Sequence, residues 1–170
     1  MQSRLIQRSG MLLAIAAAMT TACGSNSTGN NGDNNNGTPT CTVTLSGAQT
    51  GSPACTTGTA LLDKSENLTA LGFDGSGTPT VSAHVKIPGP AATGTYPASS
   101  SSIGIIDVTS GTSLWGTDGN FGTYTLTVTS VSQLSDGPTL TEYRTHGTLT
   151  ATLPPISGAA TGNVTMTITF

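Results

Sequence analysis

The chain has 170 residues, about the length of one domain, and only 8% of them are charged, against about 25% in an ordinary soluble protein. It contains 33 threonines, 19 serines and 22 glycines. This composition excludes a coiled coil, a helical bundle and a multi-span membrane protein. The scarcity of lysine and arginine also excludes nucleic-acid binding by charge.

The first 22 residues predict a secretory signal peptide. Arg4 and Arg8 give a positive start, residues 11–19 (MLLAIAAAM) are apolar, and residues 20–22 are small. This three-part order is typical of a signal peptide. The apolar run is too short to cross a bilayer, which needs about 20 residues.

A cysteine, Cys23, directly follows the small residues, so the segment resembles a bacterial lipoprotein signal. In that family the cysteine becomes the acylated N-terminus after cleavage. Thr21 and Ala22 fit the family pattern, whereas Thr20 departs from it, because an aliphatic residue is usual there. An ordinary signal peptide is therefore the alternative. By the same resemblance, Gly24 in place of Asp favours the outer membrane of a Gram-negative bacterium, on either its periplasmic or its surface face.

The chain has three cysteines, and an exported domain normally pairs its thiols. Lipidation of Cys23 leaves Cys41 and Cys55, which we expect to form a disulfide in an oxidising compartment. Two free thiols are the alternative. A zinc site is disfavoured, because the sequence has neither a CxxC motif nor a histidine near the two cysteines.

Residues 24–40 (GSNSTGNNGDNNNGTPT) contain no apolar side chain apart from Pro39. Such a segment cannot bury enough surface to offset the entropy of ordering it, so we predict a flexible tether. The expected organisation is a signal peptide over residues 1–22, a lipidated cysteine and tether over 23–40, and one folded domain over 41–170.

Residues 41–170 contain many short segments in which apolar and polar residues alternate, the pattern of a half-buried β-strand. The clearest segments are 41–45, 80–87, 123–131, 147–153 and 163–170, and the weaker ones are 56–62, 68–73, 102–108 and 112–116. Threonine occupies most positions on the polar face of these segments. It is β-branched and tolerates water, so it suits the solvated face of a sheet. Gly, Pro and Asp turn signals separate nearly all of the segments.

This spacing predicts an all-β fold, namely an antiparallel β-sandwich of eight or nine strands, with a small β-barrel as the alternative. The best helical candidate, residues 63–71, lacks an extended apolar stripe. Phe170 is expected to face inward, so truncation of the last residues is expected to damage the fold.

The sequence contains no GxSxG, HExxH, P-loop or GxGxxG motif, and its carboxylates are dispersed. His84 and His146 would bind a metal or act as a base only if their strands were neighbours, and otherwise they are solvated strand residues. We expect no cofactor and no resident metal. The sequence favours a non-enzymatic domain and leaves a hydrolase as the weakest alternative.

Aromatic residues offer one further candidate site. Trp115 precedes Asp118 and Asn120 in the segment SLWGTDGNFGTY. An exposed tryptophan can stack on a sugar ring while such side chains accept hydrogen bonds from its hydroxyls, and Tyr96 and Tyr143 could extend the platform. Alternatively, Trp115 fills the core, as the single tryptophan of a sandwich often does.

The domain also resembles a group of small bacterial lipoproteins with a Thr/Gly-rich all-β domain of unknown function. The resemblance lies in CTVTLSG, SPAC, HGTLTATL and NVTMTITF, and it implies no site residue beyond Cys23. We therefore expect a lipid-anchored envelope protein with a structural or surface-interaction role. Its partners would be the membrane and a polysaccharide or envelope protein, and a carbohydrate-binding module is the alternative function.

Overall fold

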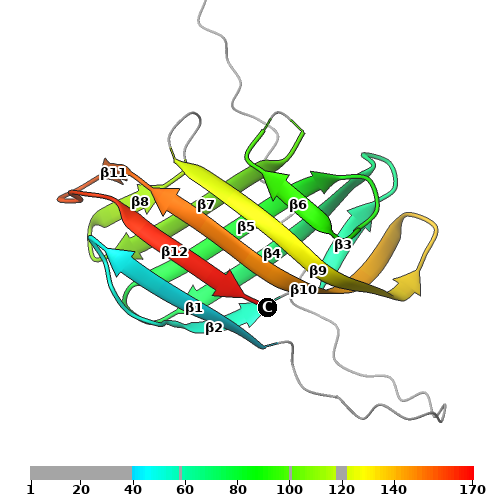
Figure 1. Cartoon of the computed structure of the whole chain (residues 1–170), viewed down its shortest axis with the longest axis horizontal. Coiled ribbons are helices and arrows are strands. Elements are labelled where there is room, and N and C mark those ends of the chain that lie inside the picture. Colours follow the sequence, from blue (N-terminus) through cyan, green and yellow to red (C-terminus); the bar gives the residue numbers. More distant parts are fainter. Residues whose placement is uncertain (1–39, 58, 100, 118–121) are drawn as a thin grey trace, which may run out of the picture. The chain divides into compact units, whose positions relative to one another are not determined.

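A computed structural model describes residues 40–57, 59–99, 101–117 and 122–170, and these residues form twelve strands and no helix (Figure 1). The strands are β1 (Thr40–Gly47), β2 (Ala54–Thr57), β3 (Ala60–Asp63), β4 (Leu68–Ser76), β5 (Thr80–Pro88), β6 (Gly94–Pro97), β7 (Ile103–Ser110), β8 (Ser113–Gly116), β9 (Thr123–Asp136), β10 (Leu140–Leu153), β11 (Pro155–Ser157) and β12 (Val164–Thr169). Among these residues, we find no helix with the length and hydropathy needed to span a membrane.

Alternation of residue type forms the strands and fixes which face each of them buries. The apolar residues of β5, from Val81 to Ile87, are at most 1% exposed. Val164, Met166 and Ile168 of β12 are fully buried, while the threonines between them are exposed or half-buried. The predicted all-β class is confirmed. The described residues form twelve strands rather than eight or nine, partly because residues 56–62 are divided between β2 and β3.

Hydrogen bonds join the strands in the order β11-β8-β7-β5-β4-β2-β1-β12-β10-β9-β6, and β3 pairs with both β4 and β10. β3 therefore closes a ring, because β4 and β10 are already connected through β2, β1 and β12. In Figure 1, strands β1, β12, β10 and β9 pass in front of β4, β5 and β7. The aliphatic side chains of both groups form one core.

Phe170 lies in this core, as its place in the alternating pattern predicts. Its ring centroid is 4.7 Å from that of Phe73 on β4, and only 8% of the residue is exposed. Its backbone exchanges two hydrogen bonds with Gly147 of β10, at 2.8 and 3.0 Å. Phe170 thus continues the pairing of β12 with β10 and also packs against β4.

Tyr124 of β9 brings a hydroxyl group into the core. This hydroxyl donates to the Ser102 carbonyl at 2.5 Å and lies 3.0 Å from the Ser102 hydroxyl. Burial raises the pKa of Tyr124, and the hydrogen bond with Ser102 partly opposes this shift. Gly104 of β7 leaves room for the ring, because a Cβ at this position would lie 2.6 Å from it.

Residues 63–71, the best helical candidate, form a turn followed by a strand. The Asp63 carboxylate accepts hydrogen bonds from the Ser65 backbone N–H at 2.8 Å, the Ser65 hydroxyl at 2.6 Å and the Glu66 N–H at 3.3 Å. Asn67 then takes a positive φ of 53°, and β4 begins at Leu68. The left-handed conformation of Asn67 ends this turn, so a helix does not continue through the segment.

We expect Phe170→Ala to lower the free energy of unfolding by about 3 kcal/mol, because truncating a buried phenylalanine removes apolar burial and leaves a cavity. Urea denaturation followed by circular dichroism measures this change. Thr169→Ala is the matched control, since its side chain is exposed and we expect a change within about 0.5 kcal/mol. Equal effects of the two substitutions would contradict the role given to Phe170.

Candidate functional site

The Cys41–Cys55 disulfide is formed, as the cysteine count predicts. The two residues lie directly opposite each other on β1 and β2, with their Cα atoms 5.2 Å apart. Both are half-buried and pack against the core. On its other side β2 pairs with β4, where Cys55 lies opposite Gly75, so the disulfide joins two neighbouring strands in the middle of the strand order.

The predicted lipidation site and the predicted tether up to residue 39 fall on residues that the structure does not describe, whereas Thr40, the last residue of the predicted tether, begins β1. Cys23 and residues 24–39 lie outside the described ranges, as do Asp118 and Asn120 of the candidate sugar site. Acylation of Cys23 therefore stays a prediction, and the candidate sugar site can be judged only by its aromatic residues.

Trp115 belongs to the core, which corrects the interpretation of this residue as a sugar-stacking platform. It is 3% exposed, and its indole N–H donates to the Gly162 carbonyl at 3.0 Å. The β7–β8 register places Trp115 opposite the buried Val108, on the inward face. A ring covered in this way has no free face for a sugar.

The other aromatic candidates do not form a platform with Trp115. Tyr96 lies on β6, at the opposite end of the strand order from β8, and its hydroxyl donates to the Ala92 carbonyl at 2.9 Å. Tyr143 of β10 is only 8% exposed. The structure therefore does not bring these three aromatic residues together on one surface.

The two histidines lie on strands that are not paired, so they do not form the joint site that neighbouring strands would have allowed. His84 is on β5 and His146 on β10. Within the described ranges, no group of three or more His, Cys, Asp or Glu residues is arranged to hold a metal ion.

His84 has a carboxylate and a hydroxyl nearby, but they are not arranged as a catalytic triad. Its Nε2 is 4.0 Å from Asp74 Oδ1, and the Ser82 hydroxyl donates to the same oxygen at 3.4 Å. In a Ser-His-Asp triad the histidine stands between the other two residues. Here the carboxylate stands between them, so the histidine has no contact through which to activate the serine.

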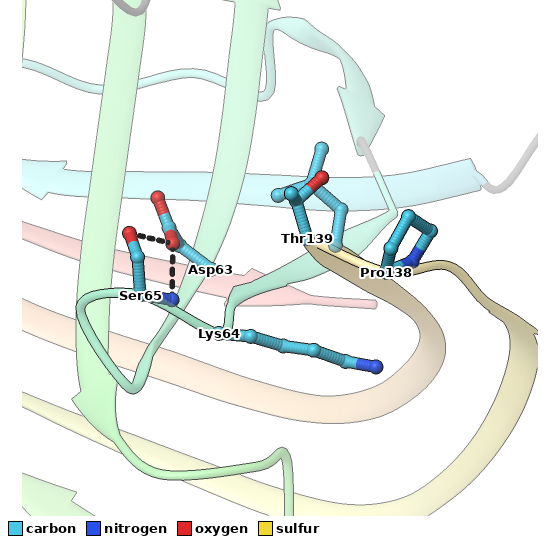
Figure 2. A pocket seen from close by; sticks show the side chains of 6 residues that line it. Asp63, Lys64, Ser65, Pro138 and Thr139 are labelled. Atoms are coloured by element: carbon cyan, nitrogen blue, oxygen red, sulfur yellow. Dashed lines mark hydrogen bonds between the residues drawn. The ribbon is translucent and has the colours of Figure 1, made fainter.

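A hollow of about 520 Å³ lies where the β3–β4 turn meets the β9–β10 turn (Figure 2). The residues that line it are Asp63, Lys64, Ser65, Pro138, Thr139 and Leu140. The Lys64 ammonium group contacts Asp136 Oδ1 and donates to the Gly137 carbonyl, each at 2.7 Å. This contact is not predictable from the sequence, because no local pattern relates two positions so far apart in the chain.

Asp136 is held in its ionised form. Hydrogen bonds from Lys64 and from the Thr141 hydroxyl, together with the positive charge of Lys64, hold the pKa of this carboxyl below its ordinary value of 3.8. The hydroxyl of Thr141 donates to Asp136 Oδ1 at 2.6 Å. The Lys64 backbone N–H also donates to the Thr139 carbonyl at 3.0 Å, so the two turns are joined by both side-chain and backbone contacts.

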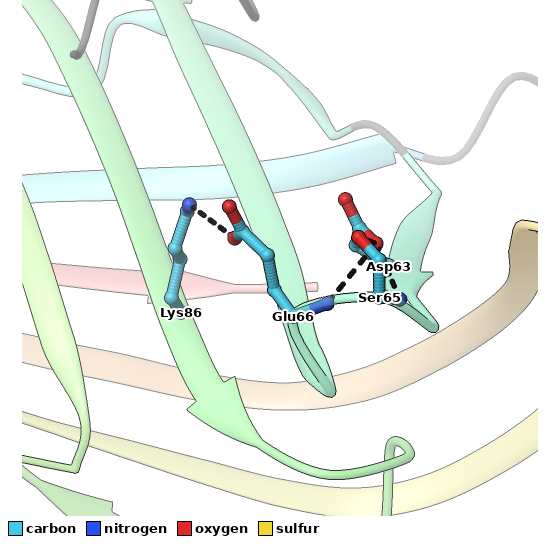
Figure 3. Close-up of polar contacts among 4 residues, drawn as sticks. All are labelled: Asp63, Ser65, Glu66 and Lys86. Carbon is cyan, nitrogen blue, oxygen red and sulfur yellow. Dashed lines mark hydrogen bonds and ion pairs between the residues drawn. The ribbon is translucent and has the colours of Figure 1, made fainter.

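The β3–β4 turn carries a second set of polar contacts, which extends to Lys86 of β5 (Figure 3). Hydrogen bonds from Ser65 and Glu66 lower the pKa of Asp63, and Lys86 lies 3.4 Å from the Glu66 carboxylate. Carboxyls with lowered pKa values are poor proton donors at neutral pH. These contacts therefore hold the β3–β4 turn in place beside β5, and the lowered pKa of Asp63 and of Asp136 makes neither carboxyl suited to act as a general acid.

Comparison of the chain with protein-family models, curated proteins and solved structures finds no match among any of the three. The site residues are therefore assigned from the chain's own geometry. Among the described residues, that geometry includes the Cys41–Cys55 disulfide, a hollow between the β3–β4 and β9–β10 turns, and a tryptophan that packs in the core.

Because Trp115 is the only tryptophan, its fluorescence reports its environment directly. We expect emission typical of a buried indole, weak quenching by iodide in the folded protein, and strong quenching after unfolding in guanidinium. Added oligosaccharides should leave the spectrum unchanged. Strong iodide quenching before unfolding would contradict the core position.

The lowered pKa of Asp136 predicts a pH-dependent contribution to stability. An ionised Asp136 stabilises the fold above its ordinary pKa of 3.8, and this contribution is lost as the pH falls through the lower folded-state value. We expect the Tm difference between the wild type and Asp136→Asn to be largest near neutral pH and to shrink toward zero in strong acid, as measured by calorimetry.

The Lys64→Ala background supplies the control for this prediction. It should reduce the effect of Asp136→Asn, whereas the effect of Asp63→Asn should persist, because Asp63 is stabilised mainly by Ser65 and Glu66. A Tm difference for Asp136→Asn that is constant across pH would show that its ionisation does not contribute.

Proposed function

We propose that the chain is a lipid-anchored envelope protein of the Gram-negative outer membrane, with a β domain that has a structural or surface-interaction role. One observation carries the proposal. Cys41 and Cys55 bond to each other, so Cys23 has no cysteine of its own chain left to pair with. An acylated cysteine is the modification that an unpaired cysteine directly after a signal-like segment would receive.

The signal-like segment and the disulfide support export independently of each other. Residues 1–22 have the order of a secretory signal, and disulfides persist in oxidising compartments such as the periplasm or the cell surface. An acylated cysteine with two or more chains anchors a protein stably, whereas a single chain does so only marginally. Gly24 after Cys23 favours the outer membrane, by resemblance to other lipoproteins.

The surface chemistry of the domain supports a structural or interaction role. The outward residues of β12 and of the last part of β10, from Thr148 to Thr152, are threonines, which keep a pleated surface in contact with water without adding charge. After the signal segment, three basic residues stand against eight carboxylates, so the proposed mature chain is acidic. Such a surface suits an exported protein that stays soluble beside its anchor.

We expect Cys23→Ala to move the protein from the membrane fraction to the soluble fraction when the full chain is expressed in a Gram-negative host. Membrane fractionation and immunoblotting measure the distribution. The matched control is Cys41→Ser with Cys55→Ser, which removes two thiols but leaves Cys23, and this variant should stay with the membrane.

Two outcomes of the fractionation would contradict the anchor. One is a wild-type protein that is soluble throughout. The other is a Cys23→Ala variant that stays in the membrane fraction to the same extent as the wild type, since another feature would then hold it there.

A further inference from the structure

The first two residues of β1 have a strand partner on one side only. Residues 40–42 pair with β2, and residues 42–47 pair with β12. Thr40 and Cys41 are therefore held in the sheet by pairing with β2 alone, since the described pairing with β12 begins at Thr42. Any tension that reaches the domain from the preceding chain acts first on this end of β1.

A strand pulled from one end opens pair by pair, so each step breaks only the hydrogen bonds of one residue pair. Behind Thr42 lie Val43 and Leu45, which are 1% and 3% exposed and belong to the core. Peeling β1 would expose both residues to water. It would also leave β12 with an unpaired edge along residues 164–169.

The disulfide stands at the point where this peeling would start. It links Cys41 to Cys55, which lies on β2 between β1 and β4. Tension entering at Thr40 therefore passes through the sulfur atoms into β2, and residues 42–54 are excluded from the path of the force. For the fold to open from this end, β2 must first separate from β4.

We propose that the Cys41–Cys55 disulfide acts as a force clamp, which prevents tension on the N-terminal tether from peeling β1 out of the sheet. This inference rests on the proposed anchoring at Cys23, because the anchor supplies the tension. The clamp is specific to that direction of pulling. A force applied between two other points of the domain does not pass through β1.

Single-molecule force spectroscopy on the unlipidated mature chain tests the clamp. One handle is joined by a thioether to Cys23, whose thiol is free while the other two are bonded. The second handle is a peptide tag inserted in the β7–β8 turn at Gly111. We expect the oxidised protein to show no extension before its main unfolding event.

In the Cys41→Ser/Cys55→Ser variant we expect an additional step at lower force. The cysteines are 14 residues apart and their Cα atoms are 5.2 Å apart in the fold, so at about 3.5 Å per residue this step should lengthen the chain by about 44 Å. Reduction of the wild-type protein while it is held folded under low force should produce the same step. This second measurement tests the same prediction if the double variant does not fold.

A second pulling geometry separates a clamp from general stabilisation. Here the handles are tags inserted in the β7–β8 turn and at Gly137 in the β9–β10 turn, so the force bypasses β1. Removal of the disulfide should lower the unfolding force much less in this geometry than through Cys23. Equal losses in both geometries, or no early step through Cys23, would overturn the proposal.

Failure of the clamp can be distinguished from failure of the anchor. The force measurement uses a thioether handle, so its result does not depend on acylation in the cell. If the force measurement shows the clamp but Cys23 is not acylated in the cell, the proposed anchor is wrong and the clamp stands. A protein that is acylated but peels at the same force with and without the disulfide would overturn the clamp alone.

Discussion

The burial of one aliphatic face per strand is the interaction on which the rest of the domain depends. On β5 and β12 the inward residues are almost completely buried, while the residues between them are polar and at least partly accessible. A strand with a single apolar face is stable only when another layer covers it. The sheet meets this requirement because strands β1, β12, β10 and β9 cover strands β4, β5 and β7 (Figure 1). Strand β3 joins the two groups by pairing with both β4 and β10.

The sequence predicted those parts of the fold that depend on local alternation. The inward residues from Val81 to Ile87 and the position of Phe170 follow from a period of two, and the structure agrees with both. β6 and β11 were missed, because each is short, contains proline and has no fully buried residue. The extra strands therefore depend on pairing partners that no local pattern specifies.

The candidate site was harder to predict, because it depends on contacts between distant segments. The disulfide followed from counting cysteines and is present. The position of Trp115 could not be decided from its neighbours in the sequence, because its inward direction is set by pairing opposite Val108. The contact between Lys64 and Asp136 joins two turns that only the folded sheet brings together.

Intact-mass spectrometry of the protein from the membrane fraction tests the proposed anchor most directly. The account predicts a chain that begins at Cys23, carries diacylglycerol and acyl groups, and takes up two alkylating groups only after reduction of the Cys41–Cys55 disulfide. A chain that begins at another residue, or one that begins at Cys23 with an unmodified thiol, would contradict the account.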